Sequence, residues 1–250
     1  MSMREFCDIP VSKVMGVFDE MTYHIPHDHD HKAGDHLRGH TTHCVALAIR
    51  AAYSLGVEDE GMLAGIAVGA KIHDIGKKWV NPSIISKETE PTDHEFDIIR
   101  QHVRWRIVFG EIEEVFGTCI LSVPQYVIDC ATGHQQKTKT EGYPSSREQT
   151  FKRYDLLDLM RVVDEFQAGF CKERPYRKAK SYEEMQADLK HRAEKGFLNK
   201  KIVDLFFDSP LKDTFHDPFI QPTIKRDIIN LVGKVSKETY EKLLHFKIAA

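Results

Sequence analysis

Apolar residues recur at helical spacing along most of this 250-residue chain. From residue 40 onward, positions three and four apart are apolar in one segment after another, and no convincing two-residue alternation of a strand is found. Gly56, Pro82 and Pro124 separate the segments. The pattern therefore predicts an all-α bundle. Before it, the alternating His/Asp run at 24–31 predicts a solvated loop, or alternatively an extra metal contact near the site.

Individual helices can be placed from their breakers and caps. Met62 begins a second core helix that is expected to close near Gly76. Thr92 and Glu95 have the spacing of a capping box, and the helix that they start is expected to carry His102. Further helices are predicted after Pro124 and at 155–170, 182–193, 200–207, 224–232 and 237–246, with a turn at 142–146.

Five of the apolar helical faces also carry a histidine or an aspartate. His73 and Asp74 end the apolar stripe that begins at Leu63, and Lys77 shares their face. A buried charge is costly unless it is paired or bound to a metal. One histidine on an apolar face is usually a core residue, but five such faces in one chain indicate a shared metal site. The candidate ligands are His40, His73, Asp74, His102, His134 and Asp164.

Charge and cysteine content narrow the class of protein. The formal net charge of −3 gives no basic footprint for a nucleic acid polymer. Five scattered cysteines fit reduced thiols better than a disulfide framework, and none falls at a predicted ligand position. No apolar run is long enough to cross a bilayer, and no signal-peptide core is present. A cytoplasmic protein is therefore expected, with a homodimer or a signalling-protein partner left open.

The order of the six candidate ligands resembles the HD phosphohydrolase superfamily. Gly142-Tyr143-Pro144 follows His134 at a spacing similar to that of the HD-GYP family, and the segments at 174–179 and 197–203 resemble its later motifs. The resemblance implies an HD-superfamily helical bundle with a metal centre in its core. We therefore expect a partly loop-like segment at 1–35, an HD-GYP-like domain at 36–208 and a helical extension at 209–250.

The resemblance implies a metal-dependent phosphodiesterase. Its expected substrate is a cyclic dinucleotide, cyclic di-GMP above all, which a metal-activated hydroxide would hydrolyse to the linear dinucleotide or to GMP. Imidazole and carboxylate ligands favour iron or manganese, with magnesium, nickel, cobalt and zinc as alternatives. Two ions are expected, the first held by His40, His73, Asp74 and Asp164, and the second by His102 and His134, with Asp74 as the bridge.

The same resemblance suggests catalytic and substrate-binding roles. Asp74 and Lys77 are the expected catalytic residues, because the Lys77 ammonium could reach a phosphate oxygen. A surface lysine at a helix end is the alternative. Arg174 and Arg177 match positions that contact phosphate in relatives, a task that suits the planar guanidinium fork. Tyr143 could stack on a base. A basic surface loop and local packing are the alternative readings of these three residues.

The segment after His134 departs from the family pattern. Gln135 stands where a second histidine is expected, which makes it at most a weak ligand, and Gln136 replaces a glutamate. Lys139-Thr140 replaces Asp-Gly. These changes keep two other functions open: a weakly active or inactive relative that binds a nucleotide or a partner protein, and an HD-superfamily di-iron oxygenase.

Overall fold

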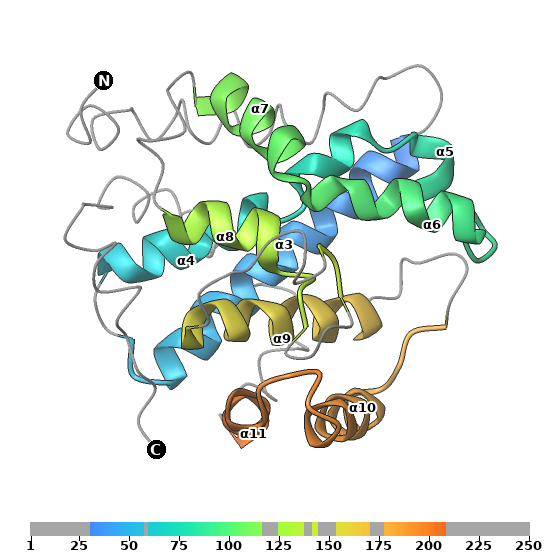
Figure 1. The fold of residues 1–250 in the computed structure, drawn as a ribbon. Coiled ribbons are helices and arrows are strands. Elements are labelled where there is room, and N and C mark those ends of the chain that lie inside the picture. Colours follow the sequence, from blue (N-terminus) through green and yellow to red (C-terminus); the bar gives the residue numbers. More distant parts are fainter. Residues whose placement is uncertain are drawn as a thin grey trace.

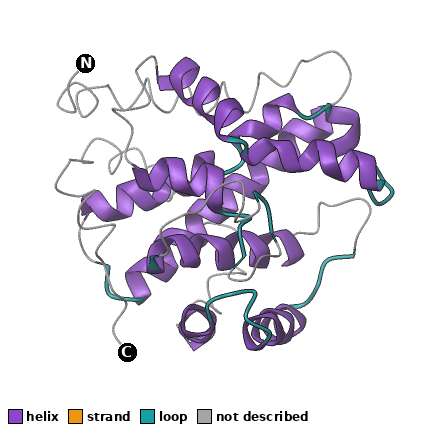
Figure 2. Ribbon diagram, in the orientation of Figure 1, coloured by secondary structure: helices purple, strands orange, loops and turns teal. Residues whose placement is uncertain are grey.

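The computed structural model describes residues 31–57, 60–116, 125–137, 142–144, 154–170 and 178–208. Within these ranges the regular secondary structure is helical and no residue lies in a β-strand (Figures 1 and 2). The predicted all-α class is therefore confirmed. None of the described helices is long and apolar enough to cross a membrane. The run at 24–30, Arg174, Arg177 and the predicted extension at 209–250 lie outside the described residues.

Helices that are distant in the sequence form the centre of the bundle. α3 (His31–Ser54) packs against α4 (Glu60–Ile72) and α9 (Asp155–Phe170), and α4 also packs against α8 (Gln125–Gly133) (Figure 1). α8 is buried along its length from its second residue onward. Small side chains at helical spacing let α3 approach its neighbours closely, because they add little bulk to the interface. They are Cys44, Ala48, Ala51 and Ala52, each at most 1% exposed.

A second layer covers one flank of α9. α10 (Tyr182–Glu194) and α11 (Lys200–Asp208) pack against each other and against α9. Both helices are seen nearly end-on beneath α9 in Figure 1. The Phe166 ring of α9 lies 5.4 Å from the Phe206 ring and 6.0 Å from the Tyr182 ring. Aromatic burial of this kind supplies much of the packing energy of a core, so these helices hold α9 in place.

Three more helices lie on the side of the bundle opposite to α10 and α11 (Figure 1). They are α5 (Pro82–Ile85), α6 (Asp93–Arg100) and α7 (Trp105–Phe116). The predicted capping box at the start of α6 is confirmed. The Glu95 backbone amide donates to Thr92 Oγ1 at 3.3 Å, and Glu95 Oε2 accepts from the Thr92 amide at 2.7 Å. The cap therefore fixes where α6 begins.

The segment after α4 corrects one prediction. The α-helix ends at Ile72 rather than near Gly76, and His73 and Asp74 lie in the turn that follows. The chain then tightens into a 3₁₀ helix, η1 (Ile75–Trp79). His73 and Asp74 therefore sit at a helix end instead of along one helical face.

Two further helix bounds differ from the prediction. α6 ends at Arg100, and His102 lies in a separate 3₁₀ segment, η2 (Gln101–Val103). α3 begins at His31, so His40 lies inside that helix rather than opening it. Helical periodicity persists through such breaks, because a 3₁₀ turn still places side chains three apart on nearly the same side. The hydrophobic periodicity could therefore place the histidines on the core side, but it could not show where the α-helices end.

Gly76 explains why η1 and η2 can pack together. A Cβ atom at this position would lie 1.9 Å from the carbonyl oxygen of His102 and 3.0 Å from the His102 Cα. Only glycine permits this approach of one backbone to another. The close contact holds the segment that carries His73 and Asp74 against the segment that carries His102.

We expect Gly76→Ala to destabilise the fold by about 1–3 kcal/mol, the usual cost of forcing extra volume into a packed interior. Chemical denaturation followed by circular dichroism measures it. Gly110→Ala is the matched control, because a Cβ there meets no atom within 4 Å in helix α7. That change is expected to stabilise the protein by about 0.5–1 kcal/mol, as for glycine in an exposed helix. Equal stability of the two variants would contradict the backbone-contact argument.

Candidate metal centre

The six candidate ligands predicted from the sequence lie together in the interior. They come from separate parts of the fold: from α3, from the turn after α4, from η2, from the residue after α8 and from α9. Each of them is at most 5% exposed. The group comprises His40, His73, Asp74, His102, His134 and Asp164.

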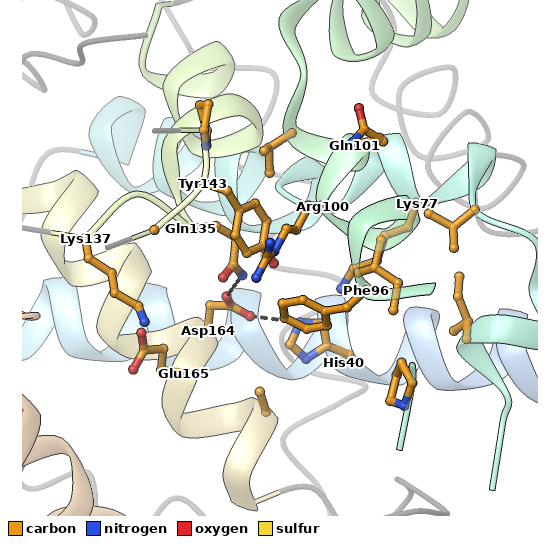
Figure 3. A pocket seen from close by; sticks show the side chains of 18 of the residues that line it. His40, Lys77, Phe96, Arg100, Gln101, Gln135, Lys137, Tyr143, Asp164 and Glu165 are labelled. Carbon is orange, nitrogen blue, oxygen red and sulfur yellow. Dashed lines mark hydrogen bonds and ion pairs between the residues drawn. The ribbon is translucent and has the colours of Figure 1, made fainter. Parts of the chain in front are cut away.

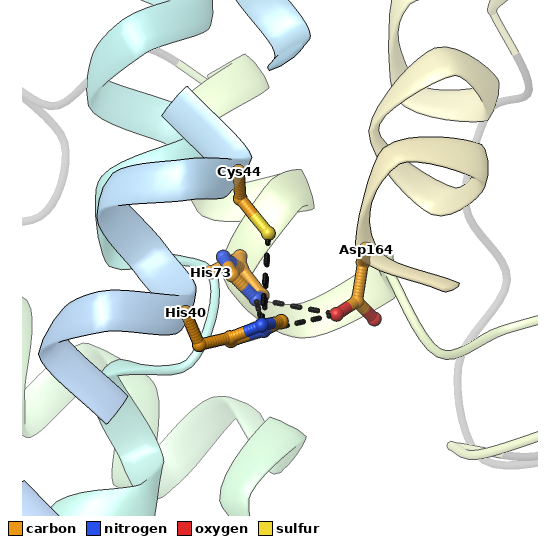
Figure 4. Close-up of side chains that lie close together, drawn as sticks. All are labelled: His40, Cys44, His73 and Asp164. Carbon is orange, nitrogen blue, oxygen red and sulfur yellow. Dashed lines mark hydrogen bonds and ion pairs between the residues drawn. The ribbon is translucent and has the colours of Figure 1, made fainter. Parts of the chain in front are cut away.

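Part of this group forms a first cluster around His40 (Figure 4). His40 Nε2 lies 3.2 Å from His73 Nε2 and 3.1 Å from Asp164 Oδ1. His73 Nε2 and Asp164 Oδ1 are 3.6 Å apart. The donor atoms of three residues thus converge on one small volume, as the ligands of a single metal ion do.

A second cluster adjoins the first, and Asp74 belongs to both. His102 Nε2 and His134 Nε2 are 3.4 Å apart, and they lie 3.3 and 3.5 Å from Asp74 Oδ1. The other oxygen, Asp74 Oδ2, lies 3.5 Å from the Nε2 atoms of both His40 and His73. The two oxygens of one carboxylate therefore face different pairs of histidines.

The far side of each imidazole is held by a hydrogen-bond acceptor. The Nδ1–H groups of His73, His102 and His134 donate to the carbonyl oxygens of Ala70, Ile99 and Cys130 at 2.7, 2.6 and 2.7 Å. His40 Nδ1 donates to Gln167 Oε1. These contacts fix the tautomer and the ring orientation, which leaves the Nε2 lone pairs directed into the centre. Gln167 was not identified from the sequence, because its partner is 127 residues away.

Electrostatics also favour a bound cation. Burial disfavours the charged form of Asp74, yet Lys77 and His73 outweigh it and hold the Asp74 pKa well below its usual range. Burial likewise opposes ionisation of Asp164, but hydrogen bonds from His40 and His73 lower its pKa well below normal. Both groups are therefore anionic at neutral pH.

One buried atom of the centre lacks a partner. Among the described residues, Asp74 Oδ1 has no hydrogen-bond partner, although it is shielded from solvent. A buried carboxylate oxygen without a partner carries a desolvation cost that a cation can offset.

Burial also lowers the His134 pKa to about 4, so this ring is neutral and can offer a lone pair. The residues present therefore fit a divalent metal and could hold one.

Three further side chains lie next to the candidate ligands: Lys77, Gln135 and Cys44. Lys77 Nζ lies 2.5 Å from Asp74 Oδ2. Gln135 Nε2 donates to Asp164 Oδ2 at 2.7 Å, so its amide nitrogen, rather than its oxygen, faces the first cluster. Cys44 Sγ lies 3.8 Å from both ring nitrogens of His40. Cys44 also belongs to a group of side chains, with His40, His73 and Asp164, whose donor atoms lie close enough to hold one ion, so the expectation that no cysteine falls at a ligand position is corrected.

The turn that carries His134 is tied to α9 by a buried polar chain. The Arg161 guanidinium donates to the carbonyl oxygen of Gly133 through Nε and Nη2, at 3.2 and 3.1 Å. Arg161 also pairs with Asp158, whose Oδ2 accepts from Asn199 at 2.9 Å. This chain fixes the backbone that precedes His134 relative to the helix that carries the candidate ligand Asp164. The sequence does not reveal these contacts, because Gly133 and Asn199 lie 28 and 41 residues from their partners along the chain.

A cavity of about 1850 Å³ opens onto the centre. His40, Asp164, Lys77 and Gln135 lie on its wall, together with residues of α6, α7 and α10 (Figure 3). Tyr143 also lines it. The cavity is large enough to give a small molecule a route to the buried carboxylates.

The tripeptide Gly142-Tyr143-Pro144 folds back onto the turn after His134. The Tyr143 amide donates to the carbonyl oxygen of Gln135 at 3.3 Å, and Gln136 Nε2 donates to that of Pro144 at 3.3 Å. The Tyr143 ring meets the His102 ring edge-on at 5.9 Å between centroids. Tyr143 thus lies between the cavity and the second cluster. Arg174 and Arg177, the predicted phosphate contacts, lie outside the described residues.

Comparison with known proteins yields partial matches. No family model matches the chain. The chain is 30% identical to a probable cyclic di-GMP phosphodiesterase of Vibrio cholerae over 122 residues, which make up 47% of this chain and 26% of that protein. It is 29% identical to a cyclic di-GMP phosphodiesterase of Pseudomonas aeruginosa over 143 residues, 56% of this chain and 31% of that protein.

A third relative is matched over a longer stretch. The chain is 26% identical to a cyclic di-GMP phosphodiesterase of Thermotoga maritima over 190 residues, which cover 71% of this chain and 49% of that protein. The chain therefore spans half or less of the length of these curated relatives. The helical fold and the buried histidines and aspartates agree with the resemblance to the HD-GYP family, and all three relatives to which the chain is similar are named as cyclic di-GMP phosphodiesterases.

Proposed function

We propose that the protein is a metal-dependent phosphodiesterase that hydrolyses a cyclic dinucleotide, cyclic di-GMP above all, to the linear dinucleotide or to GMP. The observation that carries this proposal is the position of Asp74, whose two oxygens face two pairs of histidine nitrogens. The names of the three relatives, all cyclic di-GMP phosphodiesterases, support the same substrate.

The two clusters define which residues would hold the metal. Nitrogen and oxygen ligands of this kind suit iron or manganese. Divalent ions would supply Lewis acidity toward a phosphoryl oxygen and lower the pKa of bound water toward neutrality. The first ion would be held by His40, His73, Asp74 and Asp164, and the second by Asp74, His102 and His134.

The chain's own side chains would bind and orient the substrate. The Lys77 side chain is 17% exposed and lines the cavity, so its ammonium can contact a phosphate oxygen while it stays close to Asp74. Arg174 and Arg177 would bind phosphate, as the family resemblance implies. Gln135 would keep Asp164 oriented through its 2.7 Å hydrogen bond.

Gln135 also motivates the second candidate, a protein that binds a cyclic dinucleotide without hydrolysing it. A glutamine that donates to Asp164 contributes no imidazole to the centre, whereas the family pattern has a second histidine at this position. Affinity for cyclic di-GMP without product formation under any divalent metal would favour this candidate over the phosphodiesterase.

Asp74→Asn is expected to lower the rate of cyclic di-GMP hydrolysis by at least about 100-fold. Loss of a residue that merely supports a ligand already costs about 10- to 100-fold, and this change removes charge from both clusters. Chromatography of the nucleotide products measures the rate. Asp208→Asn is the matched control, since this exposed carboxylate ends α11 and does not line the cavity. Retention of full activity by Asp74→Asn would overturn the assignment.

Gln167→Leu is expected to weaken manganese binding by about 10- to 100-fold, because the His40 Nδ1–H loses its acceptor. Isothermal titration calorimetry on the metal-free protein measures the affinity directly, independently of catalysis. Gln186→Leu makes the same chemical change on α10, away from the cavity lining, and is expected to bind manganese like the wild type. Identical affinities of the two variants would show that the His40 contact does not tune the site.

A further inference from the structure

Two aromatic rings and an arginine form a cluster on the cavity wall that the metal chemistry does not use. We call Phe96, Arg100 and Tyr143 the aromatic–arginine cluster. The Arg100 Cζ atom lies 4.6 Å from the centroid of the Phe96 ring and 5.9 Å from that of the Tyr143 ring. The two rings are 6.4 Å apart and nearly perpendicular. Figure 3 shows all three side chains together near the mouth of the centre.

The local structure explains why these residues meet. Phe96 and Arg100 are four residues apart on α6, so they lie on the same side of that helix. Tyr143 reaches them from the turn after His134. The guanidinium is attracted to the aromatic faces by a cation–π interaction, which orients it toward the cavity that all three residues line.

Exposure and position suggest that the cluster receives a ligand. Phe96 is 39% exposed, one of the few large apolar side chains of the described residues with that much contact with solvent. Tyr143 touches His102 edge-on at 5.9 Å, so a group bound on the cluster would adjoin the second metal cluster.

We infer that the aromatic–arginine cluster binds a purine base of the substrate and prefers guanine to adenine. This inference rests on the proposed cyclic dinucleotide substrate and names the residues that would select its base. Aromatic side chains stack on any base. Arginine adds selectivity, because its paired N–H donors match the O6 and N7 acceptors of guanine, whereas adenine presents an amino donor in place of O6.

The remaining hydrogen-bond capacity of Arg100 is sufficient for this task. Its Nη1 donates to Asp97 Oδ1 at 3.1 Å. A guanidinium has five N–H donors, so one contact with a carboxylate leaves donors for the edge of a base. A lysine could keep the charge but could not present the same fork.

The experiment compares equilibrium affinities of wild type, Arg100→Lys and Phe96→Leu for cyclic di-GMP and cyclic di-AMP. Arg100→Lys is expected to reduce the preference for cyclic di-GMP by about 10- to 100-fold, the size of one bidentate base contact. Phe96→Leu is expected to lower the affinity for both cyclic dinucleotides by a similar factor, about 10-fold, because stacking does not distinguish bases. Arg50→Lys, on α3 and outside the cavity lining, is the control and is expected to change neither affinity.

Two results would overturn the inference. In one, Arg100→Lys loses affinity for both ligands equally, which identifies a phosphate contact instead of a base contact. In the other, both variants bind as the wild type does. Phe96 and Arg100 lie on the surface of a capped helix, and circular dichroism of each variant verifies that the fold is intact.

A parallel assay of product formation separates this inference from the proposed function. Base preference that depends on Arg100, without linear product in the wild type, would overturn the phosphodiesterase and support the base site. Product formation with an unchanged base preference in Arg100→Lys would support the phosphodiesterase and overturn the base site. A wild-type protein that binds neither cyclic dinucleotide would overturn both.

Discussion

Burial of the Asp74 carboxylate among four imidazoles is the constraint on which the rest of the structure depends. The residue is 5% exposed, and its two oxygens lie 3.3–3.5 Å from the Nε2 atoms of four histidines. A charged group removed from water to this extent needs a compensating charge or a set of donors. Lys77 supplies part of that compensation at Oδ2, while Oδ1 has no hydrogen-bond partner among the described residues. The centre is thus built to receive positive charge.

The fold meets this constraint by presenting most of the candidate ligands from helix ends. His73, Asp74 and His134 follow directly on the last turns of α4 and α8, and His102 lies in the short 3₁₀ segment after α6. Helix ends leave carbonyl oxygens without partners inside the helix. Three of those carbonyls accept the Nδ1–H groups of the histidines. Each of these hydrogen bonds therefore gives a helix-end carbonyl oxygen a partner and also fixes the orientation of an imidazole ring.

The sequence was sufficient to predict what depends on local pattern. Helical periodicity gave the all-α class and brought out the six polar residues on apolar faces, which the structure brings together. The capping box of α6 followed from Thr92 and Glu95, because both hydrogen bonds of that motif are made within four residues. The two-cluster arrangement expected from the family resemblance corresponds to the observed distances, whereas the occupancy of the clusters by metal stays a proposal.

Tertiary contacts account for what the sequence did not predict. Gly76, which follows α4, lies against the backbone of His102, which follows α6, and no periodicity reveals this contact. Gln167 supports a histidine 127 residues earlier in the chain. Phe96 and Arg100 were not identified from the sequence, because only the folded chain places the turn at Tyr143 against them. Each of these features joins segments whose proximity exists only in the folded protein.

The position of bound metal tests the central claim most directly. Crystals grown with manganese and measured at a wavelength near its absorption edge would locate each ion by anomalous scattering. We expect one peak among His40, His73 and Asp164 and another between His102 and His134, with one oxygen of Asp74 directed at each. Manganese bound elsewhere, with both clusters empty at saturating metal, would contradict it.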